Sequence, residues 1–157
     1  MADYMWQPSE DGITHINIYS KGATDLGRWL TNFAHVPFTH PEYGEFNSIE
    51  ALWYYASTGF QHEHLRTLSG FNAKQVGKKY AKVGIDSSKF ASIIKTGIRA
   101  KLIANPKMLG VLIDTKLPLA HYYVYGGKAV HAGYEWIVLY IEDIRSACHQ
   151  KDYHPLG

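Results

Sequence analysis

Cysteine is nearly absent from this chain, because Cys148 is the only one among 157 residues. A single thiol excludes an internal disulfide framework and a zinc site built from several cysteines. Long apolar runs are also lacking, since none approaches the roughly 18 residues that a membrane-spanning helix needs. The N-terminus has neither the basic nor the apolar region of a secretion signal. We therefore expect a cytoplasmic protein with no membrane partner.

Several sequence motifs that identify a class of enzyme or nucleotide-binding protein are missing too. The sequence has no glycine-rich phosphate loop ending in Lys-Ser/Thr, no GxGxxG, no GxSxG and no HExxH. His62 and His64 stand two residues apart, a spacing that points to different faces of a helix, and no third ligand follows at a useful distance. We expect neither a metal nor a cofactor.

Acidic residues are scarce in the middle third of the chain. From Arg66 to Lys107 there are ten basic residues and one acid, Asp86, which gives this segment a charge of +9 although the whole chain carries only +2. Such a segment favours an anionic partner, either a phosphate-bearing small molecule or nucleic acid. The alternative is that the lysines only solvate helix faces.

Aromatic residues, by contrast, are abundant at 14%, and one stretch, 46–55, joins an aromatic run to an acid, Glu50. The helical spacing of its apolar residues predicts a helix from Ser48 to about Ser57. One interpretation is that Asn47 caps this helix and Glu50 closes a capping box. The other is that Glu50 borders a cleft, where desolvation raises its pKa and suits it to acid or base catalysis.

Periodicity predicts the remaining elements. A helix over 72–83 carries lysines at positions 74, 78 and 82, and a long helix follows an N-cap at 86–88 and stops at 105–106. Gly77 and Gly97, inside these patterns, indicate close backbone packing. Further helices are predicted over 108–113 and 133–147, and strands over 13–19 and 119–125. The fold class is α+β, a predominantly helical single domain over 13–146 with a small sheet, between tails at 1–12 and 147–157.

The order of several short segments resembles the NADAR family, also called YbiA-like. The resemblance extends over about residues 13–146 and rests on Ile18–Ser20, Trp29–Phe33 with Pro37–Phe38, Ser48–Glu50 with Trp53, Ala73–Lys78, Lys101, Asn105, Leu112–Thr115 and Trp136–Arg145.

This resemblance implies hydrolysis of an N-glycosidic bond, with the family's essential glutamate at Glu50 as general base or oxocarbenium stabiliser. The implied substrate is ADP-ribose attached to guanine in DNA or RNA, or a phosphorylated ribosylamino-pyrimidine. Implied substrate-binding residues are Tyr19, Asn32, Phe33, Trp53, Tyr54, Lys74, Lys78 and Tyr125.

The sequence also departs from the family pattern. Tyr54 and Ser57 stand where the family usually has Gln and Lys, and its Asp-x-x-Trp-Gly motif appears only as residues 122–126, without the acid. These departures favour a divergent member with a different substrate, of the kind found in phages, which would act in the host cytoplasm. They leave open a non-catalytic module that binds ADP-ribose, NAD or nucleic acid.

Overall fold

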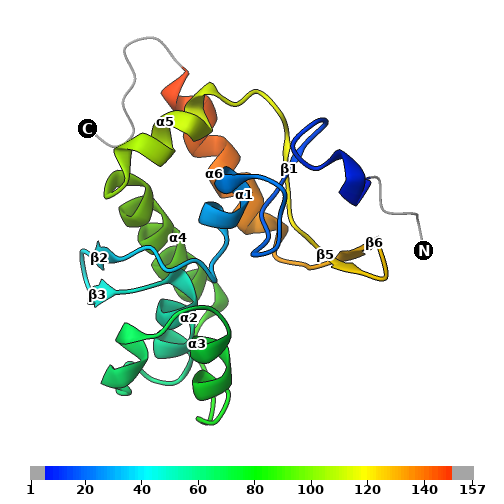
Figure 1. The fold of residues 1–157 in the computed structure, drawn as a ribbon. Coiled ribbons are helices and arrows are strands. Elements are labelled where there is room, and N and C mark those ends of the chain that lie inside the picture. Colours follow the sequence, from blue (N-terminus) through cyan, green and yellow to red (C-terminus); the bar gives the residue numbers. More distant parts are fainter. Residues whose placement is uncertain (1–5, 150–157) are drawn as a thin grey trace. The chain divides into compact units, whose positions relative to one another are not determined.

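The structure, a computed structural model, describes residues 6–149, and within them the chain forms two compact units (Figure 1). One consists of residues 32–106, and the other of residues 6–31 together with 107–149. Six α-helices and six short strands lie within the described residues, so the predicted α+β class with a predominance of helix is confirmed. The segments 1–5 and 150–157, most of the predicted tails, lie outside the described residues.

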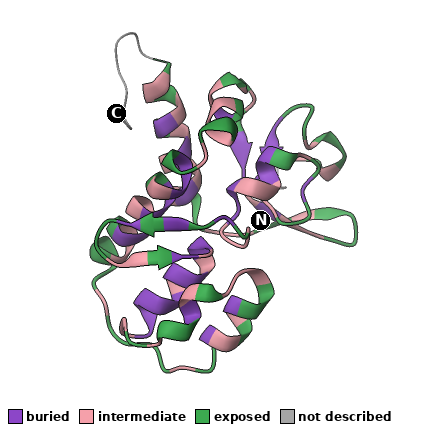
Figure 2. Ribbon diagram, turned by 60° about the vertical axis from the view of Figure 1, so that its left-hand side comes forward, coloured by how far each residue is buried: buried purple, intermediate pink, exposed green. Residues whose placement is uncertain are grey.

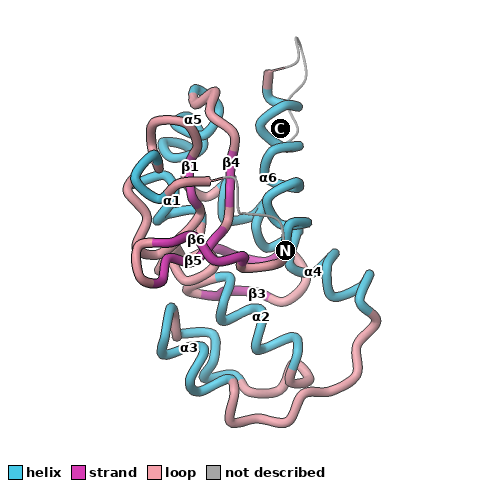
Figure 3. Tube along the Cα trace, turned by 90° about the vertical axis from the view of Figure 1, so that its right-hand side faces the viewer, coloured by secondary structure: helices cyan, strands magenta, loops and turns pink. Residues whose placement is uncertain are grey.

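The 32–106 unit is built around α2 (Ile49–Ser57). Before it comes an antiparallel hairpin, β2 (Phe38–His40) and β3 (Gly44–Phe46), which the sequence analysis did not predict. After it come a 3-10 turn, η2 (Glu63–Thr67), and helices α3 (Gly70–Gly77) and α4 (Ser87–Ile103). Helices α2 and α3 lie side by side in both Figure 1 and Figure 3, and α2 also contacts α4.

Burial explains why α2 holds this central place. Ile49, Ala51, Leu52 and Ala56 have no exposed surface, and purple marks the buried residues in Figure 2. The close approach predicted at Gly97 is confirmed, because a Cβ there would lie 2.5 Å from Cδ2 of Leu52. Side chains packed this tightly fix the orientation of α2 and of the polar residues on its flank.

The helix predicted over 72–83 is shorter than expected. It ends at Gly77, and the backbone N–H of Val83 instead donates to the carbonyl oxygen of Ser57 at 2.9 Å. Lys82 therefore lies outside the helix, and the three-lysine stripe predicted at 74, 78 and 82 is wrong beyond its first two members. The predicted cap of the next helix is confirmed, since the carboxylate of Asp86 accepts from the backbone N–H of Lys89 at 3.0 Å.

The other unit holds two small sheets. Strand β1 (Ile16–Asn17) pairs in parallel with β4 (Leu119–Ala120), and β5 (Tyr122–Tyr125) forms a hairpin with β6 (Lys128–His131). The strand predicted over 119–125 is thus interrupted at His121. The helices of this unit are α1 (Asp25–Leu30), α5 (Pro106–Asp114) and α6 (Glu135–Cys148).

Part of the predicted N-terminal tail has defined contacts in this unit. Pro8–Glu10 forms a 3-10 turn, η1, and the carboxylate of Asp11 accepts from the backbone N–H groups of Asn17 at 2.9 Å and Ala23 at 2.8 Å. None of the helices among residues 6–149 is both long enough and apolar enough to cross a membrane.

Candidate active site

The start of α2 determines whether the carboxyl group of Glu50 is committed to capping. Ser48 is the N-cap: its Oγ accepts from the backbone N–H of Ala51 at 3.0 Å and donates to the carbonyl oxygen of Leu68 at 2.9 Å. Asn47 instead donates through Nδ2 to the carbonyl oxygen of Thr67 at 3.1 Å. The predicted cap at Asn47 is therefore wrong.

This shift of one residue changes the position of Glu50 in the helix. A capping box needs its acid at the third helical position, but a helix capped by Ser48 places Glu50 at the second. The backbone N–H of Glu50 donates to the carbonyl oxygen of Asn32 at 2.9 Å, so the main chain is held without help from the carboxyl group. The predicted capping box is absent, which leaves acid or base catalysis as the remaining interpretation of Glu50.

The surroundings of Glu50 raise the pKa of its carboxyl group to about 7. Partial burial is the largest cause, because it penalises the charged form, while the positive charges of Lys74 and Lys78 act in the opposite direction. At neutral pH the group therefore exists in both protonation states. Such a carboxyl group is suited to accepting and returning a proton near neutrality.

Close packing of α3 on α2 brings the two lysines to Glu50. Gly77 lies against the ring of Tyr54, and a Cβ at position 77 would come within 2.6 Å of the Cβ of Tyr54. The contact predicted at Gly77 is thus confirmed. Lys74 lies in the last turn of α3, and Lys78 is the C-cap with helical backbone angles, four residues further along, so both project from nearly the same face.

Several predicted substrate-binding residues belong to this same unit. Asn32 contributes its carbonyl oxygen to Glu50, as described above. Phe33 contacts the first residue of α3, Gly70, because its carbonyl oxygen lies 3.5 Å from the position that a Cβ of Gly70 would take. Tyr54 is only 7% exposed. The structure brings Glu50, Lys74 and Lys78 together and leaves the predicted binding roles of the others as predictions.

Trp53 takes part in packing between helices. Its ring meets that of Phe90 in α4 edge-to-face, with centroids 4.7 Å apart and an interplanar angle of 89°. Because the side chain is only partly buried, part of the indole surface stays accessible. Its contact with a substrate remains a prediction.

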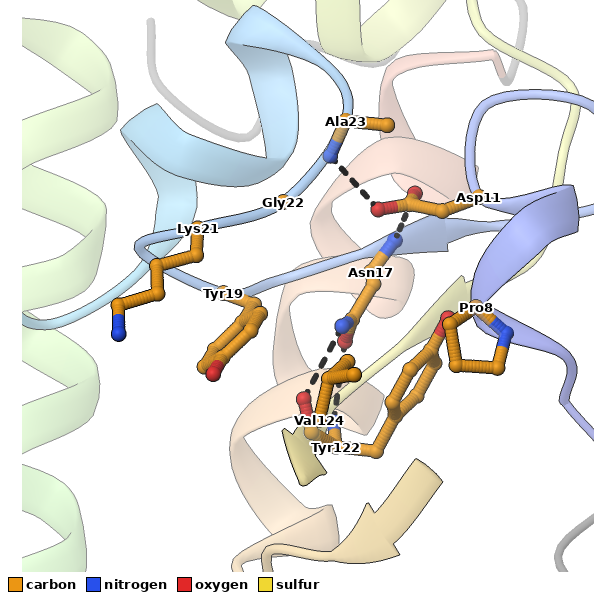
Figure 4. A pocket seen from close by; sticks show the side chains of 9 residues that line it. All are labelled: Pro8, Asp11, Asn17, Tyr19, Lys21, Gly22, Ala23, Tyr122 and Val124. Carbon is orange, nitrogen blue, oxygen red and sulfur yellow. Dashed lines mark hydrogen bonds between the residues drawn. The ribbon is translucent and has the colours of Figure 1, made fainter. Parts of the chain in front are cut away.

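Tyr19 and Tyr125 belong to the other unit. Tyr19 lines a pocket of about 340 Å³ with Asp11, Asn17 and Tyr122 among its neighbours (Figure 4). The side chain of Asn17 makes two hydrogen bonds to the backbone of Tyr122. It donates to the carbonyl oxygen and accepts from the N–H, both at 3.0 Å. Tyr125 is 65% exposed at the turn end of β5. The sequence alone did not show that these two tyrosines belong to a different compact unit from Glu50.

Lys101 is a chemically unusual residue that sequence reasoning did not select as a site residue. Its side chain is 2% exposed, and burial lowers the pKa of its ammonium group to about 7. It lies on α4 in register with buried Ile94, Ile98 and Leu102. The sequence did offer a signal for Lys101, which is a lysine at a position where the helical pattern expects an apolar residue. Such a residue is unusual, because lysine is seldom buried completely.

Among residues 6–149, no three His, Cys, Asp or Glu side chains gather in a way that could hold a metal ion. His62 and His64, considered above as metal ligands, instead both contact Tyr80: the His62 ring stacks on it at 3.6 Å, and Nε2 of His64 lies 2.6 Å from its hydroxyl.

Comparison with known proteins identifies the fold. No protein-family model matches the sequence, and no curated protein matches it either. Among solved structures, the NMR structure of the E. coli protein YbiA is similar to this chain with a TM-score of 0.65 and 18% sequence identity, over 92% of this chain and 97% of YbiA. The YbiA-like fold expected from the sequence is therefore confirmed. An identity of 18% supports the fold and carries no conclusion about activity.

Proposed function

We propose that this protein is an N-glycosidase that hydrolyses the bond between ADP-ribose and guanine in nucleic acid, with Glu50 as its central residue. One observation carries the proposal: a partly buried carboxyl group, not used for capping, has a pKa of about 7 and lies under the influence of two lysines. Perturbed acids with named charge partners are typical of functional sites. The resemblance of the sequence to the YbiA-like family supplies the class of bond.

The proposed reaction needs one carboxylate and one water molecule. The bond between the anomeric carbon and the base nitrogen lengthens first, and positive charge builds up on the ribose. Ionised Glu50 stabilises that charge and takes a proton from water, whose hydroxyl group joins the anomeric carbon. The proton then passes to the released nitrogen of the base, so atoms and charge balance.

The two lysines fit the other end of this substrate. ADP-ribose carries a diphosphate, and the ammonium groups of Lys74 and Lys78 can bind its oxygens through charge-assisted hydrogen bonds. Both lysines lower the pKa of Glu50 in the free protein. Once phosphate neutralises them, that pKa rises further, which couples the protonation of Glu50 to substrate binding.

A non-catalytic binding module is the second candidate, and one observation favours it. The charged groups that shift the pKa of Glu50 are lysines, with no second carboxyl group among them. A site with one acid can bind ADP-ribose without turning it over. The phosphorylated ribosylamino-pyrimidine has less support, because the second acid of the family pattern is missing from residues 122–126.

The deciding experiment follows the release of ADP-ribose from an ADP-ribosylated guanosine and from an oligonucleotide that carries it. The wild-type protein is compared with Glu50→Gln and with Glu45→Gln, which removes an exposed acid from β3 of the same unit. We expect release by the wild type and by Glu45→Gln, and loss of release in Glu50→Gln. Binding without release by the wild type would favour the second candidate, and equal release by all three would reject the role of Glu50.

A further inference from the structure

An aromatic ring stands in solvent beside the two lysines. Phe71, in the first turn of α3, is 62% exposed although it is a large apolar residue. It precedes Lys74 by three residues and Lys78 by seven, a spacing that puts all three on one face of a helix. The buried residues of α3, Ala73 and Gly77, lie on a different face. The exposed ring is therefore not part of the packing of α3 on α2.

The same two lysines connect this ring to the candidate active site. Gly77, one residue before Lys78, packs on Tyr54, which follows Glu50 by one helical turn. The charges of Lys74 and Lys78 act on the carboxyl group of Glu50, so the face of α3 that bears these lysines and Phe71 lies near the acid. A ligand with phosphates on these lysines would have its next group within reach of the ring. Phe71 thus marks a place where a substrate can extend beyond ADP-ribose.

The charge of the neighbouring surface indicates which chemical group of a substrate would lie beyond ADP-ribose. After α3 the chain exposes further lysines, Lys79, Lys82 and Lys89, and the single acid there is Asp86, whose carboxylate is occupied in capping α4. Positive charge that runs along a surface attracts a polyanion rather than a single phosphate. A solvent-exposed ring next to it offers a stacking partner for a flat base.

From this geometry we infer that Phe71 and the exposed lysines Lys79 and Lys82 form a contact for single-stranded nucleic acid. A base beside the modified nucleotide stacks on Phe71 and these lysines hold the backbone, while Lys74 and Lys78 stay on the diphosphate of ADP-ribose. This inference rests on the proposed function and narrows its substrate to a polynucleotide. A duplex fits less well, since its bases are already stacked and their faces are covered.

Fluorescence anisotropy with a labelled, unmodified oligothymidine of about 12 nucleotides tests the contact without any need for catalysis. We expect Phe71→Ala to weaken binding about tenfold and Phe71→Trp to preserve it, because stacking is worth about 1–3 kcal/mol per base. Leu139→Ala is the matched control, since Leu139 is a 59% exposed apolar residue of α6 in the other unit. Lys79→Gln, which removes an exposed lysine of the proposed backbone contact, should reduce the dependence of log affinity on log salt by about one charge.

The outcomes separate this inference from the proposed function. Equal affinity of the wild type and Phe71→Ala, or tighter binding of the matching duplex than of the single strand, would overturn it. Binding that depends on Phe71 in a protein that releases no ADP-ribose would support the nucleic-acid contact and reject the glycosidase. Release of ADP-ribose with no effect of Phe71 on binding would do the reverse.

Discussion

Gly77 of α3 packs directly against the aromatic ring of Tyr54 in α2, and no larger residue fits between them. Tyr54 follows Glu50 by one helical turn, and Gly77 lies between Lys74 and Lys78 in sequence. The contact therefore fixes the spacing between the acid and the two cations. It also explains how a glycine, unfavourable inside a helix, serves the site.

Replacing this glycine should separate the two helices. Gly77→Ala places a methyl group against the ring of Tyr54, and overpacking of this kind costs about 1–3 kcal/mol. We expect the free energy of unfolding in urea to fall by that amount. Gly84→Ala is the control, since nothing lies within 4 Å of a Cβ at position 84. It should leave stability unchanged or slightly higher. Equal effects of the two substitutions would contradict the tight contact.

The raised pKa of Glu50 has a consequence for stability. Folding moves the pKa of this carboxyl group from 4.5 to about 7, so the folded state binds more protons than the unfolded state between these values. Stability must then decrease as pH rises through this window, by up to about 3 kcal/mol. Glu50→Gln stays neutral at every pH. We expect it to match the wild type near pH 4 and to be up to about 3 kcal/mol more stable near pH 8.

Urea unfolding at both pH values measures this difference. Glu45→Gln, on the exposed side of β3, serves as the control and should follow the wild type throughout. A Glu50→Gln protein that gains nothing at high pH would show that the carboxyl group is solvated in the folded state. Such a gain would also mean that the chain gives up stability to keep an acid at this position, which is typical of a functional site.

Catalysis by ionised Glu50 predicts a particular pH profile. The value of kcat/KM for release of ADP-ribose should rise with pH and level off above an apparent pKa near 7, because only the carboxylate can act as a base. Lys74→Gln and Lys78→Gln should shift that apparent pKa upward, since each removes a positive charge that favours the carboxylate. Lys82→Gln is the control and should leave the profile in place, because Lys82 is not among the charges that shift the pKa of Glu50. A rate that falls with rising pH would instead indicate that protonated Glu50 is the active form.

The sequence predicted the features that depend on local periodicity. The helix at α2, the cap at Asp86 and the close contacts at Gly77 and Gly97 all follow from spacing within a short window. The end of α3 was not predictable in this way. Val83, predicted to lie inside this helix, instead donates a hydrogen bond to Ser57, twenty-six residues earlier in the chain. Bonds of this kind override local helix propensity.

The candidate site shows the same division. Glu50 was found because it stands at the edge of an aromatic run. Its pairing with Lys74 and Lys78 depends on how two helices pack, which no short window contains. Lys101 was passed over as a site residue because a single lysine in a basic segment is ordinary until its burial is known. The assignment of Tyr19 and Glu50 to two different compact units is also a property of the tertiary structure.

Asn47 and Ser48 illustrate the limit most directly, and they allow a last prediction. Both are good capping residues, so the sequence does not choose between them. In the structure the side chain of Ser48 makes two hydrogen bonds, one to the helix and one to Leu68, and the residue is fully buried. The side chain of Asn47 makes one exposed hydrogen bond, to the carbonyl oxygen of Thr67. We expect Ser48→Ala to lower the free energy of unfolding by about 1–2 kcal/mol and Asn47→Ala by less than about 1 kcal/mol.

Ser48→Ala should also disturb the site, because the first turn of α2 carries Glu50. Loss of the cap frees the N–H of Ala51, and fraying of that turn would expose the carboxyl group to water. The pKa of Glu50, followed by NMR, should then fall from about 7 toward 4.5 in Ser48→Ala and stay in place in Asn47→Ala. If Asn47→Ala produced the larger shift, Asn47 would be the true cap and the capping box would return as the explanation of Glu50.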